Sequence, residues 1–250
     1  MIAIIKFNKY DVVNNEQRFT NMAQTLKEEV RQRIIDAAIN QLLINGMHKT
    51  NMRDIAKEAK ITPGNLYRYY HSKDQLIISI TKPIVDGLND IVQKETGVDL
   101  SIDHKQLVLP DPPVGMDKLT YIEFMLVGKL RNALIEIGNL TIAYPKRMTI
   151  LLDDSIVSKQ LYEWGLAIIY EGYRACFDPI AIDQRKVEVM INVVTMSFCE
   201  GVIQLLKALL TDKQLEQYIE MLDSFLIIQK AGIAELLKKE LDRKTIIVRK

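Results

Sequence analysis

The sequence predicts an all-α protein in which a small N-terminal three-helix domain with a helix-turn-helix precedes a larger all-helical domain. Three observations predict this class. Apolar residues recur at helical spacing along most of the chain. Residues 51–73 have the pattern of two short helices joined by a tight turn. The chain has 250 residues, of which 48% are hydrophobic, so it can bury a large core in one or two domains.

A first helix is predicted over residues 26–45. Ile34, Ala38 and Leu42 are spaced i, i+4, i+8 and would form its buried face. Gly46 follows as a good C-terminal stop.

The second helix should begin at Asn51, which can cap it together with Asp54 three positions later. A carboxylate in the first turn also suits the positive end of the helix dipole. The helix has one apolar face, formed by Ile55, Ala56 and Ala59, and should end near residue 60.

The third helix, residues 63–70, should start from a Thr62 cap with Pro63 at the first helical position. Leu66 and Tyr70 share a face at i, i+4 and should pack inward. The polar side chains that this leaves outward or sideways are Asn65, Tyr67, Arg68 and Tyr69. A capping box of Ser72 and Gln75 then opens a further helix at Lys73.

An outward face with amide, guanidinium and phenol groups suits DNA. Asn and Arg can bond base edges, while Tyr hydroxyls and Lys can reach phosphates. Residues 22–80 also hold nine Lys and Arg against six Asp and Glu, a balance of +3. A solvated face without function is the alternative, but the order of caps, turn and basic groups favours DNA. The expected contact residues are Arg53, Thr62, Pro63, Asn65, Tyr67, Arg68, Tyr69 and Lys73.

Three groups of residues carry a family resemblance: Ile34, Ala37 and Ala38; Gly46, Thr50, Arg53, Asp54, Ile55 and Ala56; and Gly64, Leu66, Tyr67, Tyr69, Tyr70, Ser72, Lys73, Asp74 and Leu76. On these residues, the segment 28–80, about a fifth of the chain, resembles the DNA-binding domain of the TetR family of bacterial transcriptional regulators. Two positions depart from the family pattern. Lys60 stands where the turn usually has Gly, and Pro63 stands where a basic residue is common.

The domain division that follows has three parts. Residues 1–21 are an N-terminal extension that lacks helix signals. The extension is either a flexible arm that could touch DNA or a misassigned leader before Met22, and the leader is slightly favoured. Residues 22–80 are the TetR-type domain. Residues 81–250 are a helical effector-binding and dimerisation domain, which in this family is reached through the helix that begins at Lys73.

The larger domain should contain helices over residues 117–137, 140–153, 156–177, 184–210 and 212–240. The helix from Lys73 should tolerate a kink at Pro83. Residues 97–116 read as a long loop, for which a surface insertion is favoured over a lid. The resemblance implies a homodimer through the last two long helices, although a monomer could also bury their apolar faces.

A small-molecule site is a further hypothesis. Aromatic and Met side chains with a few polar groups can line a mostly apolar pocket. The candidate lining residues are Trp164, Tyr170, Tyr173, Phe177, Met196 and Glu200. Core packing is the favoured alternative. Glu200 supports the pocket because a carboxylate buried in an apolar run would need a partner.

Catalytic and metal-binding motifs are missing from the sequence, so we expect no enzyme, cofactor or metal site. Cys176 and Cys199 should be reduced thiols in a cytoplasmic protein without a membrane-spanning helix. The resemblance implies a repressor that binds a palindromic double-stranded operator as a homodimer and is released by a small, mostly apolar effector. A dimeric ligand-binding or scaffold protein without operator binding and a transcriptional activator remain as alternatives.

Overall fold

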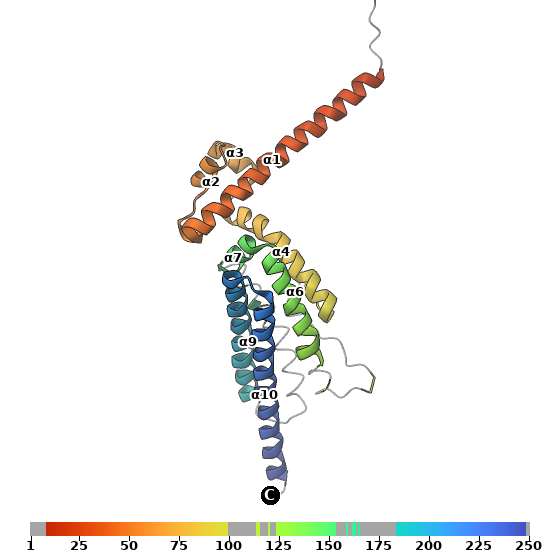
Figure 1. The fold of residues 1–250 in the computed structure, drawn as a ribbon, viewed down its shortest axis with the longest axis vertical. Coiled ribbons are helices and arrows are strands. Elements are labelled where there is room, and N and C mark those ends of the chain that lie inside the picture. The colour runs from red at the N-terminus through yellow and green to blue at the C-terminus, as the bar shows by residue number, and fades with distance from the viewer. Residues whose placement is uncertain are drawn as a thin grey trace, which may run out of the picture. The chain divides into compact units, whose positions relative to one another are not determined.

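A computed structural model shows helices throughout the part of the chain that it describes (Figure 1). The described residues are 9–99, 124–153 and 184–248, with the single positions 114, 115, 120, 159, 162, 163 and 165. Contacts between Cα atoms divide the chain into two compact units, Met1–Ile80 and Thr81–Lys250. The predicted loop over 97–116 and helix over 156–177 lie almost entirely outside the described residues.

The first unit contains α1 (Lys9–Lys49), α2 (Met52–Glu58), α3 (Pro63–Tyr69) and the start of α4 (Lys73–Thr96). The predicted start of the first helix near residue 26 was wrong, because α1 begins at Lys9. Residues 1–45 contain neither Gly nor Pro, so nothing in the local sequence ends the helix in that direction. Near its other end, helical geometry is interrupted at Gly46, with φ 74° and ψ 170°, where the stop was predicted.

The core of the first unit is built from the predicted apolar faces. Ile34, Ala38 and Leu42 of α1 are buried, as are Ile55 and Ala56 of α2. The α2 face packs against α1 and α3, so the three helices share one core. The third helix is therefore held by packing and not by its own length, because isolated helices this short are unstable in water.

The second unit contains the rest of α4, a π-helical segment (Phe124–Lys129), α6 (Leu130–Ala143), α7 (Pro145–Asp153), α9 (Gln184–Asp212) and α10 (Leu215–Val248). The break predicted between residues 137 and 140 lies instead at Tyr144, because a proline at the first helical position starts α7.

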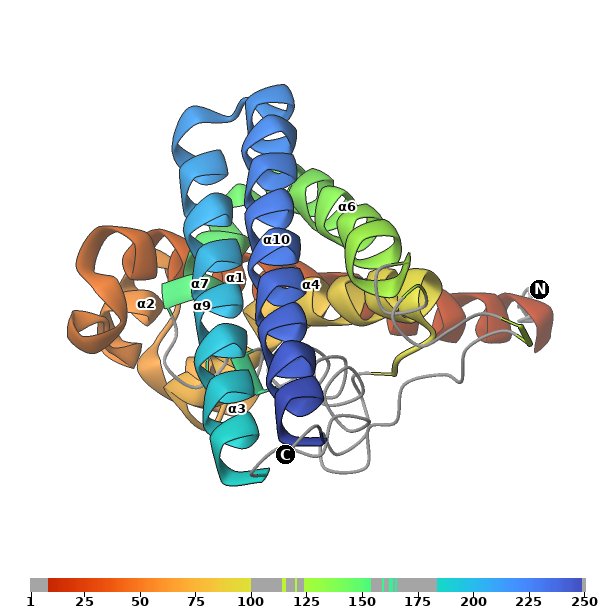
Figure 2. The same ribbon diagram turned by 90° about the horizontal axis from the view of Figure 1, so that it is seen from below.

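The last two helices lie side by side as a hairpin (Figures 1 and 2). Lys213 between them has φ 55°, and α10 begins two residues later. Thr211, in the last turn of α9, does not cap α10. The Thr211 hydroxyl donates back to the carbonyl of Lys207 in α9.

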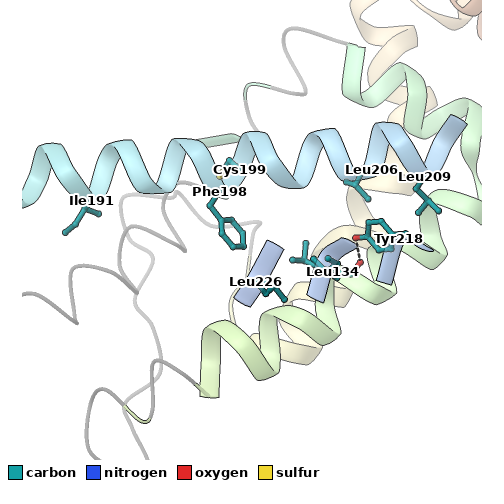
Figure 3. Packing of buried hydrophobic residues seen from close by; sticks show 9 residues of the cluster. Leu134, Ile191, Phe198, Cys199, Leu206, Leu209, Tyr218 and Leu226 are labelled. Atoms are coloured by element: carbon teal, nitrogen blue, oxygen red, sulfur yellow. Dashed lines mark hydrogen bonds between the residues drawn. The ribbon is translucent and has the colours of Figure 1, made fainter. Parts of the chain in front are cut away.

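A buried cluster joins α6, α9 and α10 (Figure 3). At its centre the fully buried Tyr218 hydroxyl donates to the Leu134 carbonyl at 2.8 Å, so the one polar atom of that ring is satisfied. Gly138 permits this contact, because a Cβ there would lie 2.7 Å from the Tyr218 ring. The remaining buried members are Ile191, Phe198, Cys199, Leu206, Leu209, Leu222 and Leu226.

Among the described residues, one helical stretch, Val189–Asp212, is long and apolar enough to cross a membrane by length and composition alone. One such helix is weak evidence, because a core helix of a soluble protein passes the same test. Ile191, Phe198 and Leu209 of this stretch belong to the buried cluster, which accounts for part of its apolar character.

Candidate DNA-binding interface

The start of α2 is fixed by its cap. The Asn51 side-chain oxygen accepts hydrogen bonds from the amides of Arg53 and Asp54, each at 3.0 Å, so two amides that the helix leaves without a partner are satisfied. At the other end of α2, the Glu58 carboxylate accepts from Asn40 at 3.1 Å and from Gln41 at 2.6 Å, both on α1. Both ends of α2 are therefore held.

The turn between α2 and α3 has a left-handed residue at Lys60, with φ 56°. The Ile61 amide donates to the Ala56 carbonyl at 3.0 Å and the Lys60 amide to the Lys57 carbonyl at 3.1 Å, which together make a Schellman motif. Glycine is the usual residue at this position, so Lys60 costs about 1 kcal/mol that the surrounding packing absorbs.

The third helix begins at a Thr62 cap, whose hydroxyl accepts from the Asn65 amide at 3.2 Å, and Pro63 occupies its first turn. Its underside is anchored by Leu66, which is fully buried, and by Tyr70, which is 5% exposed. The Tyr70 hydroxyl lies 3.3 Å from the Ser79 hydroxyl of α4. Leu66 and Tyr70 therefore pack inward, as predicted.

The opposite side of α3 is open to solvent. Tyr67 is 46% exposed and Arg68 is also exposed, while Asn65 and Tyr69 are half-buried at the edges. The other expected contact residues Arg53, Thr62 and Pro63 are exposed as well. The structure thus brings together seven of the eight expected DNA contacts as exposed or half-exposed groups on α2, the turn and α3.

The eighth expected contact, Lys73, has a different environment. Its side chain is half-buried, and its ammonium donates to the carbonyls of Met47 at 2.7 Å and Thr50 at 3.3 Å. Neither partner was predicted from the sequence. The helix it begins is capped as predicted: the Gln75 amide donates to the Ser72 hydroxyl at 3.1 Å, and the Gln75 side chain accepts from the His71 amide at 2.7 Å.

For Gly64, in the first turn of α3, the sequence predicted nothing beyond its part in the family resemblance. A Cβ added there would meet no atom within 4 Å, and its φ is not positive. Neither packing nor backbone geometry within the described chain requires glycine at this position. The signal in the sequence is a glycine placed inside a short helix, where it costs stability.

The proposed effector pocket is mostly beyond the described residues, because Trp164, Tyr170, Tyr173 and Phe177 fall outside them. Met196 is 52% exposed, and Glu200 is exposed and accepts a hydrogen bond from Gln204 at 2.7 Å. The expectation that Glu200 is a buried carboxylate was therefore wrong. Its sequence neighbours are apolar, but it projects from the solvent side of α9.

Next to it along the helix, Cys199 is buried, and burial raises the pKa of its thiol to about 12. The thiol is therefore protonated at neutral pH, in keeping with the expected reduced, packed cysteine. Burial is the largest cause that raises the pKa of the nearby Tyr162 hydroxyl, and the charge of Glu200 raises it further. The described residues include no cluster of three or more His, Cys, Asp or Glu that could hold a metal ion.

Residues 34–80, which contain the C-terminal part of α1, the helices α2 and α3 and the start of α4, match the family model described as bacterial regulatory proteins, tetR family. The match covers 47 of the 250 residues, so this segment of the chain is similar to that family. Among solved structures, a TetR-like transcriptional regulator from Rhodococcus sp. RHA1 is similar in fold, with a TM-score of 0.53 and 18% identity over 81% of this chain and 96% of that one. Both findings agree with the predicted fold class. That family model describes regulatory proteins.

Curated relatives match over shorter stretches. The fatty acid metabolism regulator protein of Bacillus subtilis is 39% identical over 49 residues, which are 20% of this chain and 25% of that protein. The transcriptional regulator UidR of Escherichia coli K12 is 40% identical over 57 residues, or 23% and 29% of the two chains. The chain thus spans well under a third of the length of these two relatives. Most of the length of either relative therefore lies outside the match.

Proposed function

We propose that this TetR-family regulator binds a palindromic double-stranded operator as a homodimer, represses transcription, and is released by a small, mostly apolar effector. The observation that carries the proposal is the two-sided character of α3. Leu66 and Tyr70 fasten one side to the domain, while Tyr67 and Arg68 are presented to solvent on the other. A short helix that packs on its domain by one side and exposes polar groups on the other is suited to insertion into a major groove.

The groups on the open side have complementary tasks in this proposal. Arg68 can donate two parallel hydrogen bonds to a guanine edge, and Asn65 can pair with adenine. Tyr67 and Tyr69 can donate to phosphates and set the register of the domain on the duplex. Arg53 on α2, which is exposed, can reach the backbone that flanks the groove.

A homodimer is supported by apolar side chains that one chain leaves uncovered. On α9, Val189, Val193 and Met196 are 58%, 61% and 52% exposed, and their i, i+4, i+7 spacing places them on one face. On α10, Ile227 and Ile228 are each 67% exposed. Pairing these helices with a second copy would remove the apolar surface from water. A two-fold dimer would also match the symmetry of a palindromic operator.

The effector part of the proposal rests on the family resemblance and on the aromatic residues around Trp164. This is the single tryptophan of the chain, so intrinsic fluorescence reports on that region alone. Candidate apolar ligands should change the Trp164 emission and lower operator affinity over the same concentration range. A ligand that releases DNA while leaving the emission unchanged would place the effector site elsewhere. Emission of free N-acetyltryptophanamide in the same ligand solutions controls for ligand absorbance.

Base reading is tested with Arg68→Ala. The operator is first selected from genomic fragments, and binding is then measured by fluorescence anisotropy on the operator and on single-base variants. The substitution should cost about 1–3 kcal/mol of operator affinity and relax preference at one base position of each half-site. Arg185→Ala on α9, an exposed arginine of the second unit, removes the same charge and should leave preference unchanged.

The alternatives give different results in the same experiments. A scaffold protein without operator binding would retain no palindromic duplex even at low ionic strength, and that result would end the proposal. An activator would bind the operator but raise reporter transcription, which would contradict repression while leaving the binding mode intact.

A further inference from the structure

Among the expected DNA contacts, Lys73 has its ammonium hydrogen-bonded to backbone carbonyls of the protein itself. It donates to the Met47 carbonyl at 2.7 Å and to the Thr50 carbonyl at 3.3 Å. Lys73 is the first residue of α4, whereas its acceptors lie at the end of α1 and just before the Asn51 cap of α2. The bonds join residues that are 26 and 23 positions apart.

These bonds connect the two ends of the segment that carries the helix-turn-helix, so this segment and the Lys73 side chain form a closed ring. The segment between Thr50 and Lys73 contains α2, the Lys60 turn and the whole of α3. We propose that Lys73 is a positioning residue that joins the two ends of the helix-turn-helix, so that α3 is presented in one orientation. In this role its ammonium acts on DNA affinity through the protein backbone and not through a phosphate.

The acceptor side of this ring is buried and hydrogen-bonded to α1. Thr50 is 2% exposed, and its hydroxyl donates to the carbonyls of Gly46 at 2.9 Å and Gln41 at 3.0 Å. Its own carbonyl, which accepts from Lys73, is therefore fixed to the end of α1. Because the Lys73 ammonium at the start of α4 donates to this carbonyl, both ends of the segment that carries α3 are restricted.

The partners also suit a lysine. Carbonyl oxygens near the C-terminal end of a helix carry partial negative charge, and a cation there is favourable. The flexible four-carbon stem of lysine lets a point charge reach two carbonyls that are three residues apart in sequence. A phosphate contact would have to compete with these two hydrogen bonds.

The inference rests on the proposed function only where DNA is used in the test. Lys73→Met keeps the apolar stem and removes the donors. Lys57→Met removes the same charge from an exposed position of α2 and serves as the matched control. Lys73→Arg keeps the charge and the donors, so it should restore most of what Lys73→Met loses.

Amide hydrogen exchange of the free protein tests the ring without DNA. In Lys73→Met, amides of α3 should exchange at least about tenfold faster than in the wild type, with α1 little changed, because local opening no longer breaks the Lys73 bonds. Lys57→Met should match the wild type. Unchanged exchange in α3 would overturn the inference, whether or not the protein binds DNA.

Salt dependence of operator binding separates positioning from phosphate contact. Losing one phosphate contact lowers the slope of log K against log salt by about 0.9. Positioning predicts an unchanged slope, with operator affinity reduced about tenfold or more and nonspecific affinity reduced less. A slope lowered by about 0.9, with the specificity ratio preserved, would identify a phosphate contact and refute positioning.

A measurement on the wild type covers the case in which Lys73→Met fails to fold. Limited acylation of the free protein, followed by peptide mass spectrometry, compares the reactivity of Lys73 and Lys57 in one sample. The Lys73 amine should react several-fold more slowly, since it is half-buried and hydrogen-bonded to two carbonyls. Equal reactivity of the two lysines would overturn the inference.

Discussion

Replacing Gly64 by alanine should stabilise the protein and weaken operator binding at the same time. The glycine is exposed, its φ is not positive, and an added Cβ would meet no atom within 4 Å. Alanine in a helix is favoured over glycine by up to about 1 kcal/mol, so the free energy of unfolding should rise by about 0.5–1 kcal/mol.

The opposite effect on DNA follows from the position of Gly64 on α3. It lies three and four residues before Tyr67 and Arg68, so the three share one exposed face. A duplex held by those side chains would come closest to the backbone at the bare Cα. An added methyl group should hold the duplex away, with an expected loss of operator affinity of about tenfold, or 1.4 kcal/mol.

Thermal unfolding and fluorescence anisotropy on the selected operator measure the two effects. Gly232→Ala on α10 is the matched control, because a Cβ there also meets nothing within 4 Å. This control should raise stability and leave affinity per dimer unchanged, with the oligomeric state checked by light scattering. A Gly64→Ala protein that binds the operator as tightly as the wild type would show that DNA does not approach the first turn of α3.

Three further substitutions test the second unit. Gly201→Ala would place a Cβ 2.5 Å from the Phe225 ring, so the free energy of unfolding should fall by about 1–3 kcal/mol, and Phe225→Leu in the same chain should recover part of it; additive losses would contradict the steric explanation. Val193→Asp on the exposed α9 face should shift sedimentation from dimer to monomer, and a variant that remains dimeric would exclude this face as the interface. Hydrogen bonding to Arg131 lowers the pKa of the Asp223 carboxyl. The contribution of this contact to the free energy of unfolding is therefore complete above the ordinary carboxyl pKa of about 4, and it is lost as the pH falls through the lowered pKa. Asp223→Asn should therefore cost at most about 1 kcal/mol at pH 7, because the two side chains are 35% and 40% exposed, and should flatten the acid limb of urea-denaturation midpoints plotted against pH.

The starts of α2, α3 and α4 could be predicted because their signals are local. Asn51, Thr62 and Ser72 each receive a hydrogen bond from an amide three residues ahead, so the relevant residue types are neighbours in the sequence. Lys60 stands at the turn position where the family pattern usually has glycine, and its backbone is left-handed in the structure, with φ 56°.

The errors concern features that neighbouring residues do not determine. The acceptors of Lys73 are 23 and 26 positions away, and a spacing rule for helices does not reach that far. Glu200 was placed among apolar neighbours, but a helix turns by about 100° per residue, so adjacent residues project from different sides. The long N-terminal part of α1 was missed because weak helix propensity was read as absence of a helix.

The separation of tasks on α3 has a consequence for how such a regulator acquires new targets. Leu66 and Tyr70 pack α3 on the core of the domain, whereas residues 65, 67 and 68 project away from the core or lie at its edge. Exposed positions usually tolerate exchange within about 0.5 kcal/mol of stability. Duplicated copies of this gene can therefore evolve to recognise different promoters by substitution of a few exposed residues of α3. The buried core that holds the helix does not have to change.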